Sequence, residues 1–501
     1  MWPLIIILFS NILIATSTNY EKVLKERSNL IEKELKMMVG HSIELSDSEL
    51  KANEIIMNLK REEIENGFVY PKNYNLSKHF FEYKELVKDT KLYKVLKSMP
   101  KGAVLHGHDT AILGPDYVLE LTYDDNLWIC FDEDESDVSF IFSKHSPTGF
   151  CETEWEKAND IRRYNNVTEF DATLRKFFTL VIDNPQEVYT DVNTVWEEFQ
   201  KYFIRTSPLF TYKPVWEKYY YNTLLALRND NIMYLEIRSV LPPLYDLKGN
   251  IYNSVETAKS YKKVTEKFKK DYPDFFGAKL IYAPLKLVDR ETLRSYIKIA
   301  REIHELMPEF LVGFDLVGQE DLGVPLKEFL PDLANIGLDL YLHAGETNWY
   351  GTSSDENLFD AIALGTKRIG HAFALVKHPL LMEEVKKRKI ALEVNVVSNV
   401  VLKLVDDVRN HPLATYLSQD MPVVLSSDDP GAWEAEPLTH DFYVTFVGVS
   451  SRHADLKMLK QLALNSLYYS SYNEKDKLVH EFQIRWTKFI DSIVKDKWDH
   501  I

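Results

Sequence analysis

The sequence is short of cysteine and of positive charge, and it lacks a long apolar run. Lys and Arg total 60 against 76 Asp and Glu, which gives a net charge of −16. A surface of this average sign repels phosphate backbones, so we expect no nucleic-acid partner. A membrane span needs about 20 apolar residues, and no segment after the N-terminus meets that requirement, so no membrane span is expected.

The chain begins with an apolar stretch over residues 4–15, followed by small residues up to Ser17. This pattern is typical of a signal peptide at residues 1–17 and predicts a secreted, extracellular protein. A membrane anchor is the alternative, because no Lys or Arg precedes the apolar stretch.

Only two cysteines are present, Cys130 and Cys151. In an exported chain such a pair favours a disulfide, with two buried thiols as the alternative. The sequons that begin at Asn75 and Asn166 are candidate glycosylation sites of a secreted glycoprotein.

Residues 18–98 have a helical pattern. Apolar residues recur at helical spacing from Val23 to Val39, Ser46 and Glu49 form a capping box, and Gly67 is expected to end the helix that follows. Amphipathic helices must cover their apolar stripe, either with the rest of the chain or with a second copy of it.

Residues 99–490 alternate between short apolar runs and helical stretches. The runs are 103–106, 232–237, 278–282, 310–316, 338–343, 368–371, 390–395 and 422–425. Eight runs with helices between them predict an α/β fold, a (β/α)8 TIM barrel. An open doubly wound sheet would need a Gly-rich phosphate loop, which the sequence lacks. The long interval after the first run predicts an insertion at about 125–185 that carries both cysteines.

Polar motifs follow several of these predicted strands, where a barrel places its reactive groups. His106 and His108 are two residues apart on one strand, so both imidazoles point to the same face. With His343 and Asp428 they offer three nitrogens and one carboxylate oxygen, a set that suits one Zn²⁺ per subunit and leaves room for water. We expect the metal to act mainly by activating that water.

Three further residues at these strand ends are candidates for proton transfer or substrate binding. His371 is placed either to take a proton from the attacking water or to orient the hydroxide, with packing as its alternative role. Glu346 can donate a proton only where burial raises its pKa, and a solvent-facing carboxylate is the alternative. Asp429 can accept a hydrogen bond from the substrate or cap a helix that begins at Pro430.

The motifs at 99–108, 313–318, 343–347, 368–372 and 426–430 closely resemble, in order, those of the adenosine deaminase-related growth factors. These are the secreted branch of the adenosine and AMP deaminase family, and the likeness spans nearly the whole chain. It implies a zinc-dependent hydrolase that converts adenosine, and also 2′-deoxyadenosine, to inosine and ammonia and so lowers extracellular adenosine. It also implies specific roles: His106, His108, His343 and Asp428 as zinc ligands, Glu346 as the proton donor to purine N1, His371 as the residue that serves the hydroxide, and Asp429 at N7.

The resemblance implies further contacts as well. The nucleoside pocket would be formed by Asp109, Trp196, Glu197, Phe199, Phe203 and Gly318. The N-terminal helices would pair two chains into a homodimer, and a growth factor of this kind would contact a cell-surface receptor or glycan. Leu285 stands where some relatives have a substrate-binding histidine, so we expect altered ribose contacts. Two alternatives stay open: a signalling protein with incidental turnover, and a deaminase that acts on AMP.

Overall fold

The computed structural model describes residues 2–496, with side chains from residue 19 onward. Its centre consists of two four-stranded parallel sheets. The first contains β1 (Gly102–Val104), β5 (Ile232–Ser239), β8 (Ala278–Tyr282) and β9 (Leu311–Phe314), and the second contains β10 (His343–Ala344), β11 (Arg368–His371), β12 (Ala391–Val394) and β13 (Val423–Leu425).

Isolated parallel bridges join the two sheets into a closed ring. Phe314 pairs with Leu340 on one side, and Gly107 pairs with Asp428 on the other. The (β/α)8 barrel prediction is therefore confirmed.

The expected strand at 338–343 is wrong in its extent, because only its last residue belongs to β10. The Thr366 hydroxyl accepts from Leu342 N at 3.2 Å and contacts Leu340 O at 3.0 Å, so a side chain replaces the ladder partner there.

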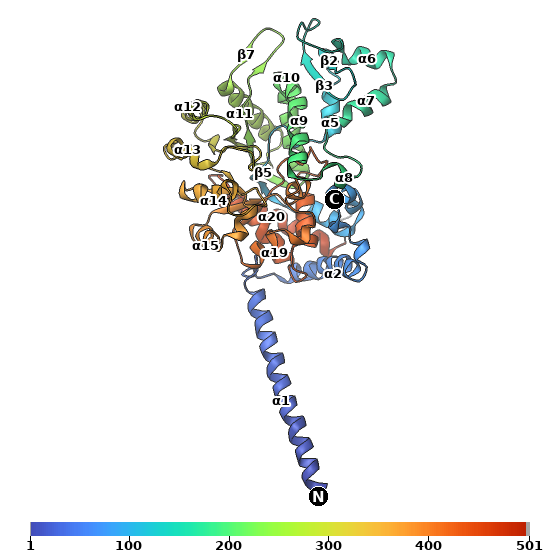
Figure 1. The fold of residues 1–501 in the computed structure, drawn as a ribbon, viewed down its shortest axis with the longest axis vertical. Coiled ribbons are helices and arrows are strands. Elements are labelled where there is room, and N and C mark those ends of the chain that lie inside the picture. Colours follow the sequence, from blue (N-terminus) through green and yellow to red (C-terminus); the bar gives the residue numbers. More distant parts are fainter. Residues whose placement is uncertain (1, 497–501) are drawn as a thin grey trace.

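Helices surround the barrel and connect its strands (Figure 1). They are α9 (Val192–Thr211), α10 (Lys213–Asn229), α11 (Ser254–Asp271), α12 (Arg290–Leu306), α13 (Leu326–Leu333), α14 (Ser353–Ala363), α15 (Pro379–Arg388), α16 (Val396–Val401), α17 (Leu413–Ser418), α18 (Thr439–Val444), α19 (Leu456–Tyr468) and α20 (Lys475–Val494). On α12 the buried residues are Leu293, Ile297, Ala300 and Ile303. Their three- and four-residue spacing places them on one face, which explains why this segment packs as a helix.

The N-terminal region is helical, as predicted. It contains α1 (Trp2–Leu35), α2 (Asp47–Val69), α3 (Phe80–Tyr83) and α4 (Lys91–Ser98). The Ser46–Glu49 capping box is present at the start of α2, which packs against α20. Gly67 does not end α2, so that prediction is wrong. A Cβ at this position would lie 2.4 Å from Tyr74 Cδ2, and glycine is needed there to admit the Tyr74 ring.

Helix α1 projects away from the rest of the molecule (Figure 1). Its exposed apolar side chains include Tyr20, Val23, Leu30 and Ile31. Met1 lies outside the described residues and nothing is described of the side chains of residues 2–18, so the signal peptide stays a prediction. Within the part of the chain that was described, no helix combines the length and apolar character needed to cross a bilayer.

The insertion after the first strand forms a small unit on the surface. It contains an antiparallel sheet of β2 (Leu127–Phe131), β3 (Val138–Phe142) and β4 (Glu156–Lys157), together with α6 (Ala158–Tyr164) and α7 (Val167–Lys176). The disulfide between Cys130 and Cys151 is confirmed and ties β2 to the loop before β4. Asn166 is the N-cap of α7, whereas Asn75 begins a short 3-10 helix; glycosylation at both stays a prediction.

Candidate active site

The four candidate metal ligands converge at the barrel mouth. One ligand atom from each of His106, His108, His343 and Asp428 lies within 4.8 Å of the others. Asp428 Oδ1 is 3.3 Å from His106 Nε2 and 3.1 Å from His108 Nε2. His106 Nε2 and Asp428 Oδ1 are buried and have no hydrogen-bond partner. Leaving such atoms unsatisfied costs about 1–3 kcal/mol each, and a cation among them removes that cost. The donor set fits zinc.

Asp428 is positioned where the segment after β13 pairs with the segment after β1 and closes the barrel. Its backbone has a φ of 60°, in the left-handed region. Asp428 N donates to His106 O at 3.2 Å, and His108 N donates to Asp428 O at 3.2 Å. These two hydrogen bonds hold a conformation that is unfavourable for a non-glycine residue, so barrel closure itself brings the carboxylate to the histidines.

Two carboxylates hold the outer nitrogens of the ligand histidines. His106 Nδ1 lies 2.8 Å from Glu393 Oε2, and His343 Nδ1 lies 2.7 Å from Asp315 Oδ2. Such partners keep the hydrogen on Nδ1 and direct the Nε2 lone pair toward a metal. Burial lowers the pKa of His343 to about 4, which keeps its ring neutral, the form that binds a metal.

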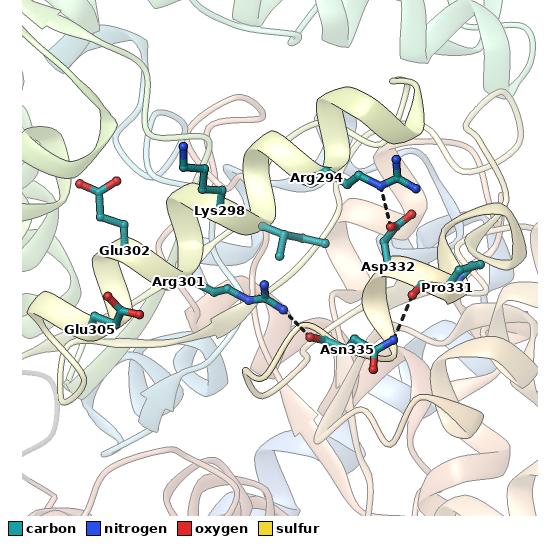
Figure 2. A pocket seen from close by; sticks show the side chains of 9 residues that line it. Arg294, Lys298, Arg301, Glu302, Glu305, Pro331, Asp332 and Asn335 are labelled. Carbon is teal, nitrogen blue, oxygen red and sulfur yellow. Dashed lines mark hydrogen bonds and ion pairs between the residues drawn. The ribbon is translucent and has the colours of Figure 1, made fainter.

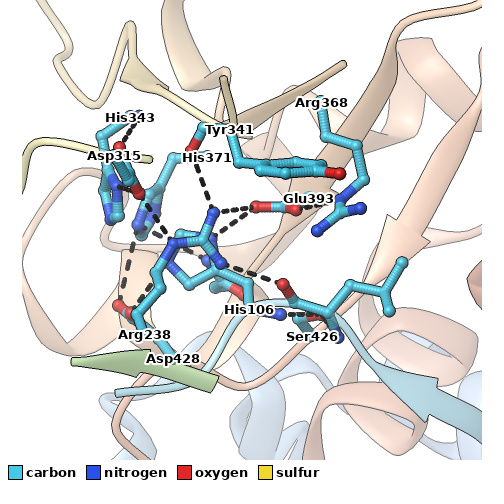
Figure 3. A network of polar contacts seen from close by, with 12 residues as sticks. His106, Arg238, Asp315, Tyr341, His343, Arg368, His371, Glu393, Ser426 and Asp428 are labelled. Carbon is cyan, nitrogen blue, oxygen red and sulfur yellow. Dashed lines mark hydrogen bonds and ion pairs between the residues drawn. The ribbon is translucent and has the colours of Figure 1, made fainter. Parts of the chain in front are cut away.

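Buried arginines balance these carboxylates (Figure 3). Arg238 Nε is 2.7 Å from Asp315 Oδ2, and its NH2 group is 2.7 Å from Glu393 Oε2. Arg368 Nε is 2.5 Å from Glu393 Oε1. Although burial opposes it, the charges of Arg238 and Arg368 hold the pKa of Glu393 well below its usual range. The sequence alone assigned no role to Glu393, Arg238 or Arg368; the signal for Glu393 was a charged residue inside the otherwise apolar strand β12.

Glu346 is buried beside the candidate metal ligands, so the solvent-facing alternative is wrong. Burial, with the charge of Asp428, raises the pKa of Glu346 well above its ordinary value. The Glu320 carboxylate accepts hydrogen bonds from Gly345 N at 2.9 Å and from Glu346 N at 2.6 Å. Glu346 Oε1 lies 3.4 Å from His371 Nδ1. These contacts fix a neutral carboxyl group next to the proposed metal position.

Asp429 is also buried, and its Oδ1 has no hydrogen-bond partner. Burial and the neighbouring Asp428 raise its pKa well above the ordinary value. The residues after Pro430 form turns instead of a helix, so the helix-cap alternative for Asp429 is wrong. Its unpartnered oxygen is available to a ligand.

Comparison with known proteins agrees with this geometry. Residues 179–483 match the family model for adenosine deaminase, and residues 3–96 match the one for the adenosine/AMP deaminase N-terminal region. The adenosine deaminase of Lutzomyia longipalpis is 43% identical over 94% of this chain and 94% of its own. This chain belongs to the adenosine deaminase family. Adenosine deaminase 2 of Homo sapiens is 39% identical over 93% of each chain, which confirms the resemblance to the growth-factor branch.

A solved structure shares the fold of this deaminase. An amidohydrolase from Burkholderia ambifaria, solved with bound Zn, has a TM-score of 0.52 at 15% identity, with 82% of this chain and 95% of that chain covered. Family membership makes the chain a hydrolase of the deaminase type.

Aromatic residues of α9 pack against one another and against Trp433. The Phe199 ring centroid lies 5.3 Å from that of Trp196, 4.9 Å from that of Phe203 and 6.1 Å from that of Trp433, which closely follows Asp429 in the chain. Glu197 is different: its side chain is 70% exposed and 3.0 Å from Lys201 Nζ, so the structure does not bring it to the aromatic cluster.

The remaining pocket candidates of the deaminase differ in burial. Asp109 is buried, and its carboxylate accepts a hydrogen bond from the Tyr261 hydroxyl. Gly318 has a φ of 116°, and the nearest atom to a Cβ built there is Lys286 Cγ at 4.0 Å, so its backbone faces open space. Leu285 is 55% exposed and offers no polar group.

A surface groove between α12 and α13 has a volume of about 560 Å³ (Figure 2). Its arginines already have partners: Arg294 Nε is 2.8 Å from Asp332 Oδ1, and Arg301 Nε donates to Ile336 O at 2.9 Å. None of the residues that line it belongs to the strand-end motifs, so the deaminase chemistry lies elsewhere.

Proposed function

We propose that this deaminase is a secreted, zinc-dependent enzyme that converts adenosine and 2′-deoxyadenosine to inosine and ammonia and so lowers extracellular adenosine. One observation carries the proposal: His106, His108, His343 and Asp428 present converging donor atoms, two of which are buried without a partner. In its domain organisation, residues 1–17 are a signal peptide, 18–98 the helical dimerisation region and 99–490 the barrel with its insertion at about 125–185.

These four residues would hold one Zn²⁺ per subunit, which when bound supplies Lewis-acid activation of a water molecule. The neutral carboxyl of Glu346 donates its proton to purine N1, which makes C6 more electrophilic. Asp429 would hold N7, and His371 would orient the water that adds to C6. Water adds across the C6–N1 bond and ammonia leaves, so adenosine and water give inosine and ammonia.

The nucleoside pocket that we propose has an apolar wall and two polar contacts. Trp196, Phe199 and Phe203 provide an apolar wall for the nucleoside, Asp109 a polar contact, and the Gly318 backbone a contact to N3. Because Leu285 has no hydrogen-bonding group, we expect weaker ribose recognition. AMP is the competing substrate.

The exposed apolar residues of α1 support pairing of two chains through their N-terminal helices. Tyr20 is 63% exposed, Val23 58% and Leu30 57%, and helices of this kind become stable when a partner covers the stripe. The sequons at Asn75 and Asn166 support glycosylation of a secreted chain, and contact with a cell-surface receptor or glycan is expected from the family resemblance.

The decisive experiment is an absorbance assay on adenosine with a zinc determination on the same purified sample. We expect turnover that a strong chelator abolishes and added zinc restores, with slower turnover of AMP. Glu346→Gln is expected to keep its zinc and lose turnover, whereas the exposed Glu383→Gln keeps both. Full turnover in metal-free protein, or in Glu346→Gln, contradicts the proposal.

A further inference from the structure

A series of buried hydrogen bonds connects His371 Nδ1 through Asn399 and His411 to the backbone of Leu413. Asn399 Nδ2 lies 3.2 Å from His371 Nδ1, Asn399 Oδ1 lies 3.0 Å from His411 Nε2, and Leu413 N donates to His411 Nδ1 at 3.0 Å. His371 is 1% exposed, Asn399 0% and His411 2%. Water therefore does not compete for any of these contacts.

The contact between Leu413 N and His411 determines which atom donates in each of these hydrogen bonds. A backbone N–H can only donate, so His411 Nδ1 must be the acceptor and the neutral ring carries its hydrogen on Nε2. Burial lowers the pKa of His411 to about 3, which keeps the ring neutral. The His411 Nε2 hydrogen then points at Asn399 Oδ1.

The orientation of the Asn399 amide determines which nitrogen of His371 accepts a hydrogen bond. Because Asn399 Oδ1 accepts from His411, the amide must present its NH2 group to His371 Nδ1. His371 Nδ1 is consequently an acceptor, and a neutral imidazole that accepts at Nδ1 carries its hydrogen on Nε2. The Glu346 carboxyl, whose Oε1 lies 3.4 Å from the same nitrogen, is neutral and is compatible with an acceptor there.

The opposite side of the His371 ring is compatible with a hydrogen on Nε2. His371 Nε2 lies 3.8 Å from Asp428 Oδ2 and 3.5 Å from the Asn395 amide. Asn395 Oδ1 is buried and has no partner. The orientation of an amide is decided by its hydrogen bonds, and turning that of Asn395 by half a turn gives this oxygen the Nε2 hydrogen as its donor.

We propose that the Leu413 N–H, His411 and Asn399 form a relay that fixes the tautomer of His371, with the hydrogen on Nε2, the nitrogen that faces the candidate metal ligand Asp428. The proposal deepens the proposed function and rests on it. His371 then orients the attacking oxygen as a donor and does not receive its proton. Asn399 and His411 are positioning residues, because they act through His371 and touch no substrate.

Asn399→Asp tests the relay with almost no change in size. A carboxylate cannot donate to His371 Nδ1 and instead draws the hydrogen to that nitrogen. We expect kcat on adenosine to fall by about 10- to 100-fold, with KM changed by less than about 2-fold and zinc content unchanged. Asn410→Asp makes the same change at an exposed position one residue before His411 and is expected to keep wild-type kcat.

Substitutions at His411 separate the relay from mere packing. His411→Gln retains an amide N–H that can donate to Asn399, whereas His411→Leu does not. We expect Leu to lower kcat about as much as Asn399→Asp, and Gln to recover most of the loss. Equal activity of the Leu and Gln variants contradicts the relay.

A spectroscopic readout does not depend on turnover. Nitrogen NMR of histidine-labelled enzyme distinguishes the protonated from the bare nitrogen of each ring, and His371→Gln identifies the His371 signals. We expect the hydrogen on Nε2 in the wild type and on Nδ1 in Asn399→Asp. A wild-type hydrogen on Nδ1 overturns the inference even in an active enzyme, whereas lack of turnover with the hydrogen on Nε2 overturns only the proposed function.

Discussion

Replacing Glu393 by Gln removes the central negative charge of the network behind the ligand histidines. The carboxylate lies 2.7 Å from the Arg238 guanidinium, 2.5 Å from that of Arg368 and 2.8 Å from His106 Nδ1. Glutamine keeps the shape but has one acceptor oxygen in place of two, and its NH2 group must face an N–H donor. Both arginines then share one neutral partner in a site that is fully buried.

Two effects follow, and each has a known scale. Breaking a buried ion pair by removing one partner costs about 3–5 kcal/mol of folding free energy. Losing the carboxylate that orients a ligand histidine lowers metal affinity by about 10- to 100-fold. Because the pKa of Glu393 is lowered on folding, its stabilisation is fully present above the pKa of the unfolded carboxyl, about 4.3. That stabilisation is lost as the pH falls toward the folded-state pKa.

Denaturant unfolding of the metal-free enzyme and competition with a zinc chelator measure these two effects. We expect Glu393→Gln to unfold at lower denaturant concentration and to bind zinc more weakly, with the stability difference shrinking in acid. Glu383→Gln, on the exposed face of α15, controls for loss of one negative charge. The reasoning is refuted if the two variants have the same stability and the same zinc affinity.

Three further predictions concern other parts of the molecule. Lys286 is buried without a hydrogen-bond partner, and its charge acts to lower the pKa of Glu346. Lys286→Met should therefore raise that pKa and move the alkaline limb of the kcat/KM profile to higher pH, and a limb that moves to lower pH contradicts the assignment. Replacing both Cys130 and Cys151 by Ser should lower the free energy of unfolding by about 3 kcal/mol while kcat stays unchanged, because the disulfide lies in the surface insertion; equal denaturation midpoints would argue against it. Leu30→Glu with Ile31→Glu places charge on the exposed stripe of α1 and should convert the proposed dimer to monomer in light scattering, whereas the same mass as wild type speaks against pairing through α1.

The barrel and the candidate ligands could be predicted because their signals are local. Strand periodicity and the residue that follows each strand are both visible in short windows, and barrel topology then brings the strand ends together. His106 lies more than 200 residues before His343 and Asp428 in the sequence. The motif around each of these residues is nevertheless enough to identify it as a candidate ligand.

The supporting residues could not be predicted in the same way, because their partners are distant in sequence. Glu393 is 287 residues from its partner His106 in the sequence, and Asn399 is 28 residues from its partner His371. A charged residue inside a buried strand indicates that it has a polar partner, but the sequence does not indicate which residue that partner is. Gly67 shows the converse error: its role depends on the Tyr74 ring and not on the helix pattern around it.

Anomalous diffraction at the zinc absorption edge tests the central claim most directly. We predict one zinc peak per chain between His106, His108, His343 and Asp428, with each ligand atom at about 2.0–2.2 Å. Crystals of an active enzyme with no peak there, or with zinc bound only elsewhere, would contradict the account.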